Sequence, residues 1–319
     1  MTATNNIVSI RRRRTKSVGV EGRGMYDRIV IAVDGSDEAE RAAERGLEFA
    51  RVFDAAVDVV YVVEWKSLRL ARSADEKARL RECGETVLEE IEELASAIDR
   101  PITTELTEGK PALRIAEYAA ERDAGLIVVG RQGLTGFGKR LLGGVMEQLL
   151  HRSDVPVFVV PKGASDATAD YSDLLVPTDG SEIAADAARH GAAVAQGYGS
   201  TVHVLNVVDL QAAGGAFDAG GLGREFIDRL EANGEGIVED AATEIGDEGP
   251  DVTTAVVRMT SFDGIAAGVR EYVDDTDIDL VVMGARGRSN LGRRVLGSVT
   301  SSLLRTLDVP VLVVTRSSR

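Results

Sequence analysis

The chain has 319 residues, enough for two domains of ordinary size, and its 52 acidic and 37 basic residues give a net charge of −15. Such an acidic chain repels nucleic acids and anionic membranes, so neither is expected as a partner, and no apolar run approaches the ~20 residues of a membrane span. The single cysteine, Cys83, excludes an internal disulfide and favours a cytoplasmic protein.

Residues 1–24 differ in charge from the rest of the chain, because they hold six basic residues and one acid. Residues 25–319 therefore carry a net charge of −20. Arginines outnumber lysines by 31 to 6, and such an acidic, lysine-poor composition resembles that of haloarchaeal proteins. No apolar segment follows the run Arg11–Arg14, which excludes a secretory signal peptide. We expect residues 1–24 to be a disordered basic extension that is dispensable for the fold.

From residue 25 onward, short β-branched runs alternate with amphipathic stretches. This alternation predicts parallel strands joined by helical crossovers, with helices on both faces of an open sheet. Ser36 and Ser181, each after an Asp-Gly pair, are expected to cap the first helix of each copy. The expected strands are 28–33, 57–64, 102–107, 126–129 and 156–160, and the expected helices are 38–52, 74–98, 112–122 and 143–152.

The second half of the chain repeats the first. Residues 28–50 match 173–195, 102–119 match 252–269, and 125–133 match 279–287, at offsets of 145, 150 and 154. A repeat of about 150 residues is too long for a solenoid unit and indicates a domain duplication. We therefore expect two tandem α/β domains, residues 25–161 and 172–316, joined by a short linker.

Each copy carries a glycine-rich loop between its fourth strand and last helix, GRQGLTGFGKRLLGG from residue 130 and GARGRSNLGRRVLGS from residue 284. Glycines let a backbone approach a ligand closely, and a helix N-terminus favours phosphate. In the second loop, positive charge is expected from Arg286, Arg288, Arg293 and Arg294. The spacing Gly-x2-Gly-x9-Gly is neither a Walker A loop nor the dinucleotide fingerprint. Taken alone, such a loop is as often a tight connection as a ligand site.

An aspartate ends the first strand of each copy, at Asp34 and Asp179. Asp-Gly after a strand is common turn chemistry, so these carboxylates have a structural interpretation as well as a binding one. If the first and fourth strands are neighbours, the carboxylate and the glycine loop face one crevice at the carboxyl ends of the strands.

Three features together resemble the universal stress protein family in its tandem two-domain form: VDGS and TDGS after the first strands, the Gly-x2-Gly-x9-Gly-[Ser/Thr] loop, and the closing DVPVFVVP and DVPVLVVT. The resemblance covers residues 25–314 and implies an adenine nucleotide alpha hydrolase-like fold with five parallel strands in the order 3-2-1-4-5. It also implies pairing of the two domains through their last strands, and leaves a homodimer open.

The resemblance assigns cofactor-binding positions in both copies, with the aspartate and a second-strand valine at the nucleoside and the loop residues at the phosphates. Gly144 departs from the family pattern, which has serine or threonine there, so the first loop is expected to be the weaker one. The positions are Asp179, Val207, Met283, Gly284, Gly287, Gly297, Ser298 and Val299 in the second copy, and Asp34, Val62, Gly130, Gly133, Gly143 and Val145 in the first.

The function implied is that of a cytoplasmic regulator in stress that binds ATP, with Mg²⁺ as escort, and acts on unknown protein partners. No phosphoryl-transfer machinery is recognisable, and no residue is assigned to catalysis. Two alternatives stay open, a slow ATP hydrolase or phosphotransferase of the same fold, and a dimerisation scaffold that binds no nucleotide.

Overall fold

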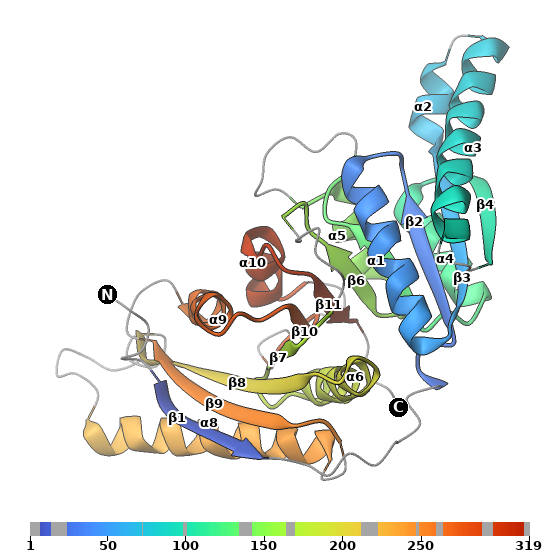
Figure 1. The fold of residues 1–319 in the computed structure, drawn as a ribbon. Coiled ribbons are helices and arrows are strands. Elements are labelled where there is room, and N and C mark those ends of the chain that lie inside the picture. The colour runs from blue at the N-terminus through green and yellow to red at the C-terminus, as the bar shows by residue number, and fades with distance from the viewer. Residues whose placement is uncertain are drawn as a thin grey trace. The chain divides into compact units, whose positions relative to one another are not determined.

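The computed structural model describes residues 7–13, 24–71, 73–97, 101–133, 142–163, 170–211, 223–246, 249–259, 264–288 and 296–315. These residues form two compact units, each with a parallel-dominated sheet that carries helices on both faces (Figure 1). No helix in these ranges has both the length and the apolar character needed to cross a membrane.

The first unit is built from the first copy of the repeat. Its parallel strands lie in the order β4-β3-β2-β5-β6. Helix α1 packs with α3, and α4 packs with α5. The strands are β2 (Arg28–Val33), β3 (Ala56–Glu64), β4 (Ile102–Gly109), β5 (Leu126–Gly130) and β6 (Val157–Val160), and the helices are α1 (Asp37–Phe53), α2 (Trp65–Leu70), α3 (Ala74–Ala97), α4 (Pro111–Glu121) and α5 (Gly144–Arg152).

Local chemistry explains most of these bounds. Helix α1 begins where the Ser36 hydroxyl accepts a hydrogen bond from the Ala39 amide at 3.2 Å, and it ends at Asp54 in the left-handed conformation. The central strands are buried on both faces, as their valine and isoleucine runs predict. Helix α2 was not expected, because its six residues are too few to show a helical period and only Leu68 is buried.

The second unit repeats this arrangement with strands in the order β9-β8-β7-β10. Helix α6 packs with α8, and α9 packs with α10. Its strands are β7 (Asp173–Pro177), β8 (Thr201–Asp209), β9 (Val252–Met259) and β10 (Leu280–Gly284), and its helices are α6 (Glu182–Tyr198), α8 (Arg224–Ile245), α9 (Gly264–Asp275) and α10 (Ser298–Thr306). Strand β11 (Val311–Val314) pairs antiparallel with β6 and belongs to the first compact unit.

The expectation of a disordered N-terminal extension is wrong for residues 7–13. They form strand β1 (Ile7–Arg13), which pairs antiparallel with β9 at the edge of the second unit. Strand β9 has only one other neighbour, β8, so its outer backbone groups need a partner. The basic residues of this segment suggested a solvated tail, but at least one of them pairs with acidic residues of α8. Arg11 forms ion pairs with Glu235 and Glu239.

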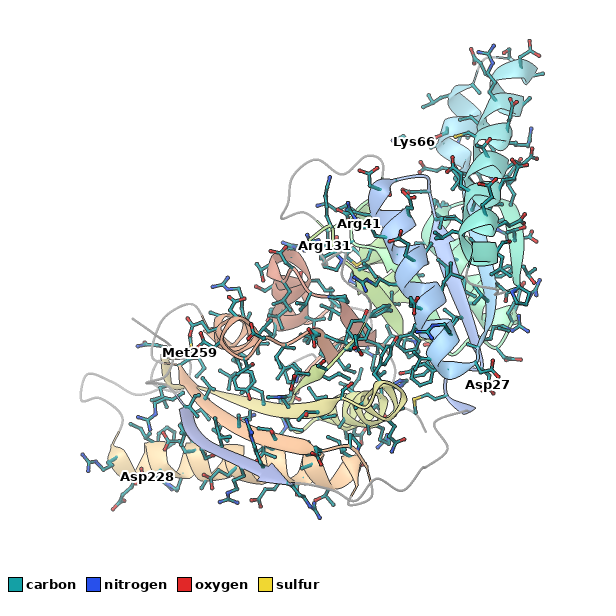
Figure 2. All side chains as sticks on the ribbon, in the orientation of Figure 1. Asp27, Arg41, Lys66, Arg131, Asp228 and Met259 are labelled. Atoms are coloured by element: carbon teal, nitrogen blue, oxygen red, sulfur yellow. The ribbon has the colours of Figure 1, made fainter. Side chains whose placement is uncertain are left out.

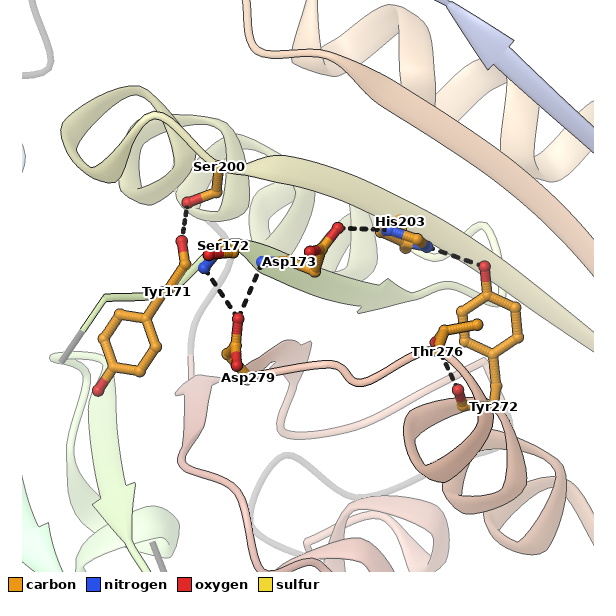
Figure 3. A network of polar contacts seen from close by, with 8 residues as sticks. All are labelled: Tyr171, Ser172, Asp173, Ser200, His203, Tyr272, Thr276 and Asp279. Carbon is orange, nitrogen blue, oxygen red and sulfur yellow. Dashed lines mark hydrogen bonds and ion pairs between the residues drawn. The ribbon is translucent and has the colours of Figure 1, made fainter. Parts of the chain in front are cut away.

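A polar network ties the amino ends of the strands of the second unit (Figure 3). His203 lies between Tyr272 and Asp173, with its ring nitrogens 2.9 Å from the Tyr272 hydroxyl and 3.1 Å from Asp173 Oδ1. Asp279 accepts hydrogen bonds from the amides of Ser172 and Asp173. Burial raises the pKa of Tyr272 to about 12. These contacts make His203 a structural residue, at the end of the sheet opposite the carboxyl ends of the strands.

Candidate functional site

The carboxyl ends of β7 and β10 bring together an aspartate and a glycine loop in the second unit. Asp179 follows β7, and its Oδ2 accepts a hydrogen bond from the Arg288 amide at 2.7 Å. Its Oδ1 accepts a second one from the Ser181 amide at 3.0 Å. Asp179 is therefore both a turn residue and a contact to the loop, and its role toward a ligand stays a prediction.

The second glycine of the loop leaves room for this contact, which a side chain there would displace. A Cβ atom at Gly287 would lie 2.5 Å from Asp179 Oδ2, closer than real Cβ contacts come. The last glycine closes the loop, because the Gly297 amide donates to the Ala285 carbonyl at 2.8 Å. Gly297 is the N-cap of α10, and Ser298 is the exposed first residue of that helix. This cradle leaves backbone amides at a helix N-terminus, which is chemistry that fits a phosphate.

Two further side chains hold the second loop and its turn; sequence reasoning missed Thr300 and expected Arg288 only as a positive charge. Thr300 is buried and donates from Oγ1 to the Gly284 carbonyl at 3.0 Å. Arg288 reaches across the turn, and its Nη2 donates to the Gly180 carbonyl at 3.1 Å. Neither contact can be inferred from the spacing of the glycines, so only the structure reveals these two hydrogen bonds.

The remaining predicted residues of the second copy surround these contacts. Val207 is a buried residue of β8, with 9% of its surface exposed, and Met283 is a buried residue of β10, with 5% exposed. Val299 is half-buried in the first turn of α10. Arg293 and Arg294, which were expected to add positive charge, lie outside the described residues, as does the centre of the first loop at 134–141.

The first copy has the same frame with different polar contacts. Asp34 Oδ1 accepts hydrogen bonds from the Ser36 amide and hydroxyl, at 3.1 and 2.6 Å. A Cβ atom at Gly133 would lie 2.1 Å from Asp34 Oδ2, so the carboxylate approaches the loop here too. The Gly143 amide donates to the Arg131 carbonyl at 3.0 Å. Gly130 is the half-buried last residue of β5, Val62 is a half-buried residue of β3, and Val145 is exposed on α5.

Besides Gly144, which stands where the second copy has Ser298, three buried residues of the first copy differ from their counterparts at the second site. Buried Arg131 stands after β5 where the second copy has Ala285 (Figure 2). Glu38, also buried, accepts a hydrogen bond from the Gln132 amide at 2.8 Å, and its counterpart is Ile183. Met146 stands where the second copy has Thr300. The substitutions are visible when the repeats are aligned, but only burial shows that they change the interior of the site.

A cavity of about 340 Å³ opens beside the first turn, between α1 and α3. None of the predicted binding residues lines it. Three carboxylates among its lining residues disfavour a polyphosphate, so it is separate from the loop. The lining residues are Val33, Gly35, Ser36, Ala39, Glu40, Val87, Glu90, Ile91, Glu93 and Leu94.

Comparison with known proteins gives one consistent result. The Universal stress protein family matches the chain twice, over residues 25–161 and 170–315. A universal stress protein of Methanocaldococcus jannaschii is 37% identical over 145 residues, which cover 44% of this chain and 85% of that protein. A universal stress protein of Mycolicibacterium smegmatis is 26% identical over 300 residues, 90% of this chain and 96% of that one. The crystal structure of a universal stress protein from Archaeoglobus fulgidus superposes with a TM-score of 0.65 at 23% identity, covering 91% of this chain and 98% of that one.

Proposed function

This chain belongs to the universal stress protein family, with two tandem domains, and from that premise we propose that it is a cytoplasmic regulator in stress that binds an adenine nucleotide. The proposed ligand is ATP escorted by Mg²⁺, and the second domain is the principal site. Protein partners respond, in this proposal, to the bound state of that domain. The three phosphates of ATP are negatively charged, and the backbone amides and arginines of the loop can bind them.

The observation that carries the proposal is the contact between Asp179 and the glycine loop. One carboxylate holds the Arg288 amide at 2.7 Å, and Gly287 leaves a space that any side chain would fill. Asp179 and Val207 would hold the nucleoside, and the amides at the start of α10 with the Ser298 hydroxyl would hold phosphate. Arg286 and Arg288 add positive charge to this end of an otherwise acidic chain.

The first domain is proposed to bind more weakly. Its described residues keep the frame, since Asp34 approaches Gly133 and Gly143 is the N-cap of α5. It lacks the hydroxyl at Gly144, and a hydrogen bond to a charged phosphate is worth ~1.5–3 kcal/mol. Because ~1.4 kcal/mol corresponds to a tenfold change in affinity, this site should bind at least about ten times more weakly.

Calorimetric titration of the full chain with Mg²⁺-ATP tests the proposal. We expect one strong and one weak site, with the strong site weakened by Ser298→Ala and by Asp179→Asn. Ser301→Ala is the matched control, because Ser301 lies on the same helix and outside the loop. Two equal sites, or an unchanged strong site in the Ser298→Ala chain, would contradict the assignment of the phosphate site. Phosphate release measured on the same samples distinguishes a binding protein from a slow hydrolase.

A further inference from the structure

Strand β1 pairs with an edge whose counterpart in the first domain has no strand partner among the described residues. The counterpart of β9 is β4, which ends its sheet within the described residues and carries the acids Glu105 and Glu108. The equivalent positions in β9 are Ala255 and Arg258, and most of β9 is buried. Charged residues on an edge strand discourage pairing with another strand. The edge of β9 lacks these acids, and residues 7–13 cover it.

The pairing of β1 has a defined register. Arg13 lies opposite Val252, Ile10 opposite Ala255 and Ile7 opposite Val257, with one irregularity between residues 7 and 9. Main-chain pairing of this kind supplies affinity for an extended segment, while side chains on alternate positions supply selectivity. The segment that fits this edge is therefore specified by its side chains.

Helix α8 runs along β9 and presents three glutamates at four-residue intervals (Figure 1). Glu231 pairs with Arg258 of β9. Arg11 of β1 pairs with the other two, Glu239 and Glu235, the latter at 3.7 Å. Because successive side chains alternate between faces, Arg12 points to the opposite face, where its charge partly offsets the effect of burial on the pKa of Tyr272. Strand β1 therefore places one arginine on each face of the sheet at this edge, Arg11 on the face covered by α8 and Arg12 on the opposite face.

We propose that the edge formed by β9 and α8 is a docking site for a basic extended segment, filled in this chain by its own residues 7–13 and open to the same segment of a second copy when β1 leaves. The site lies in the second domain and does not depend on nucleotide binding. Its ligand class is an extended peptide with an arginine facing α8. Because β1 already fills the site, it competes with any added peptide of this class for the edge of β9.

Hydrogen exchange of the β9 amides in the full chain tests whether Arg11 holds the strand. Arg11→Glu places a negative charge beside Glu235 and Glu239, and we expect about a tenfold faster exchange in Val252–Met259. Arg81→Glu is the matched control, because Arg81 forms an exposed ion pair with Glu108 in the other unit. A second variant, Ser9→Pro with Ile10→Pro, removes β1 without altering charge, since adjacent amides point to opposite sides of a strand and one must face β9.

A fluorescent peptide of residues 5–15 then tests docking from outside the chain. We expect it to bind the proline variant at least ten times more tightly than the wild type, whose own strand competes. The same peptide with Arg11→Glu should bind the proline variant about tenfold more weakly. Equal binding to both chains would overturn the proposal. Faster exchange of β9 without peptide binding would also overturn it, because the edge would then serve only its own chain.

Discussion

Restoring the missing hydroxyl of the first loop, by Gly144→Ser, tests the phosphate assignment most directly. Gly144 is the first residue of α5, and a Cβ atom added there meets nothing within 4 Å. The new side chain therefore meets no described residue, and the gain over an alanine at the same position reports the hydroxyl. In the second domain Ser298 is likewise the first residue of α10.

The magnitude follows from the chemistry of one bond. A hydrogen bond to a charged phosphate contributes ~1.5–3 kcal/mol, so Gly144→Ser should tighten the weak site roughly 10- to 150-fold. Calorimetry at fixed salt measures the two sites together, and the strong site should stay unchanged. Fixed salt matters because screening weakens phosphate contacts.

The matched control is Gly144→Ala, which adds the same Cβ without the hydroxyl. Both substitutions replace glycine in a helix and raise helix propensity, by up to ~1 kcal/mol for alanine. An equal gain from alanine and serine would show that helix formation, and not a phosphate contact, changes the affinity. No gain from serine would mean that the hydroxyl at this position does not reach the ligand.

Three further outcomes follow from the structure. Gly287→Ala places a Cβ 2.5 Å from Asp179 Oδ2 and should lower ATP affinity at the strong site by about tenfold in calorimetry, whereas Gly236→Ala, in open space on α8, should not; equal effects would refute the cradle. Burial lowers the pKa of His190 to about 4, so the unfolded chain binds a proton that the folded chain does not between about pH 6.5 and 4. Stability should therefore fall by about 3 kcal/mol as the pH drops through that window, and denaturant unfolding of His190→Gln should lose this dependence while exposed His151→Gln keeps it; an unchanged slope in His190→Gln would contradict the assignment. Because residues 25–319 carry a net charge of −20, the melting temperature should rise with KCl into the molar range, and a flat curve would exclude the halophilic interpretation.

The sequence by itself determined the elements that have a local signature. The first strand was expected at 28–33 and lies there as β2, and the helix expected at 38–52 is α1, whose cap at Ser36 was also expected. The cap expected at Ser181 is only half right, because Ser181 is the N-cap residue of α6 but its side chain makes no cap hydrogen bond with the described residues. Buried β-branched runs and amphipathic stretches encode these elements in covalent order, and the duplication carries them into the second unit. The aspartates and glycines of the two loops were found in the same way, from spacing that repeats, and their role toward a ligand stays a prediction.

Only the tertiary structure decided which distant segments complete each unit. Residues 7–13 look like a solvated basic tail until β9, some 240 residues later, offers an edge and α8 offers glutamates. The burial of Arg131 is decided in the same way. The reason is physical: periodicity reports which faces of an element must be buried, whereas edge pairing and the burial of a charge depend on a partner that no local pattern names.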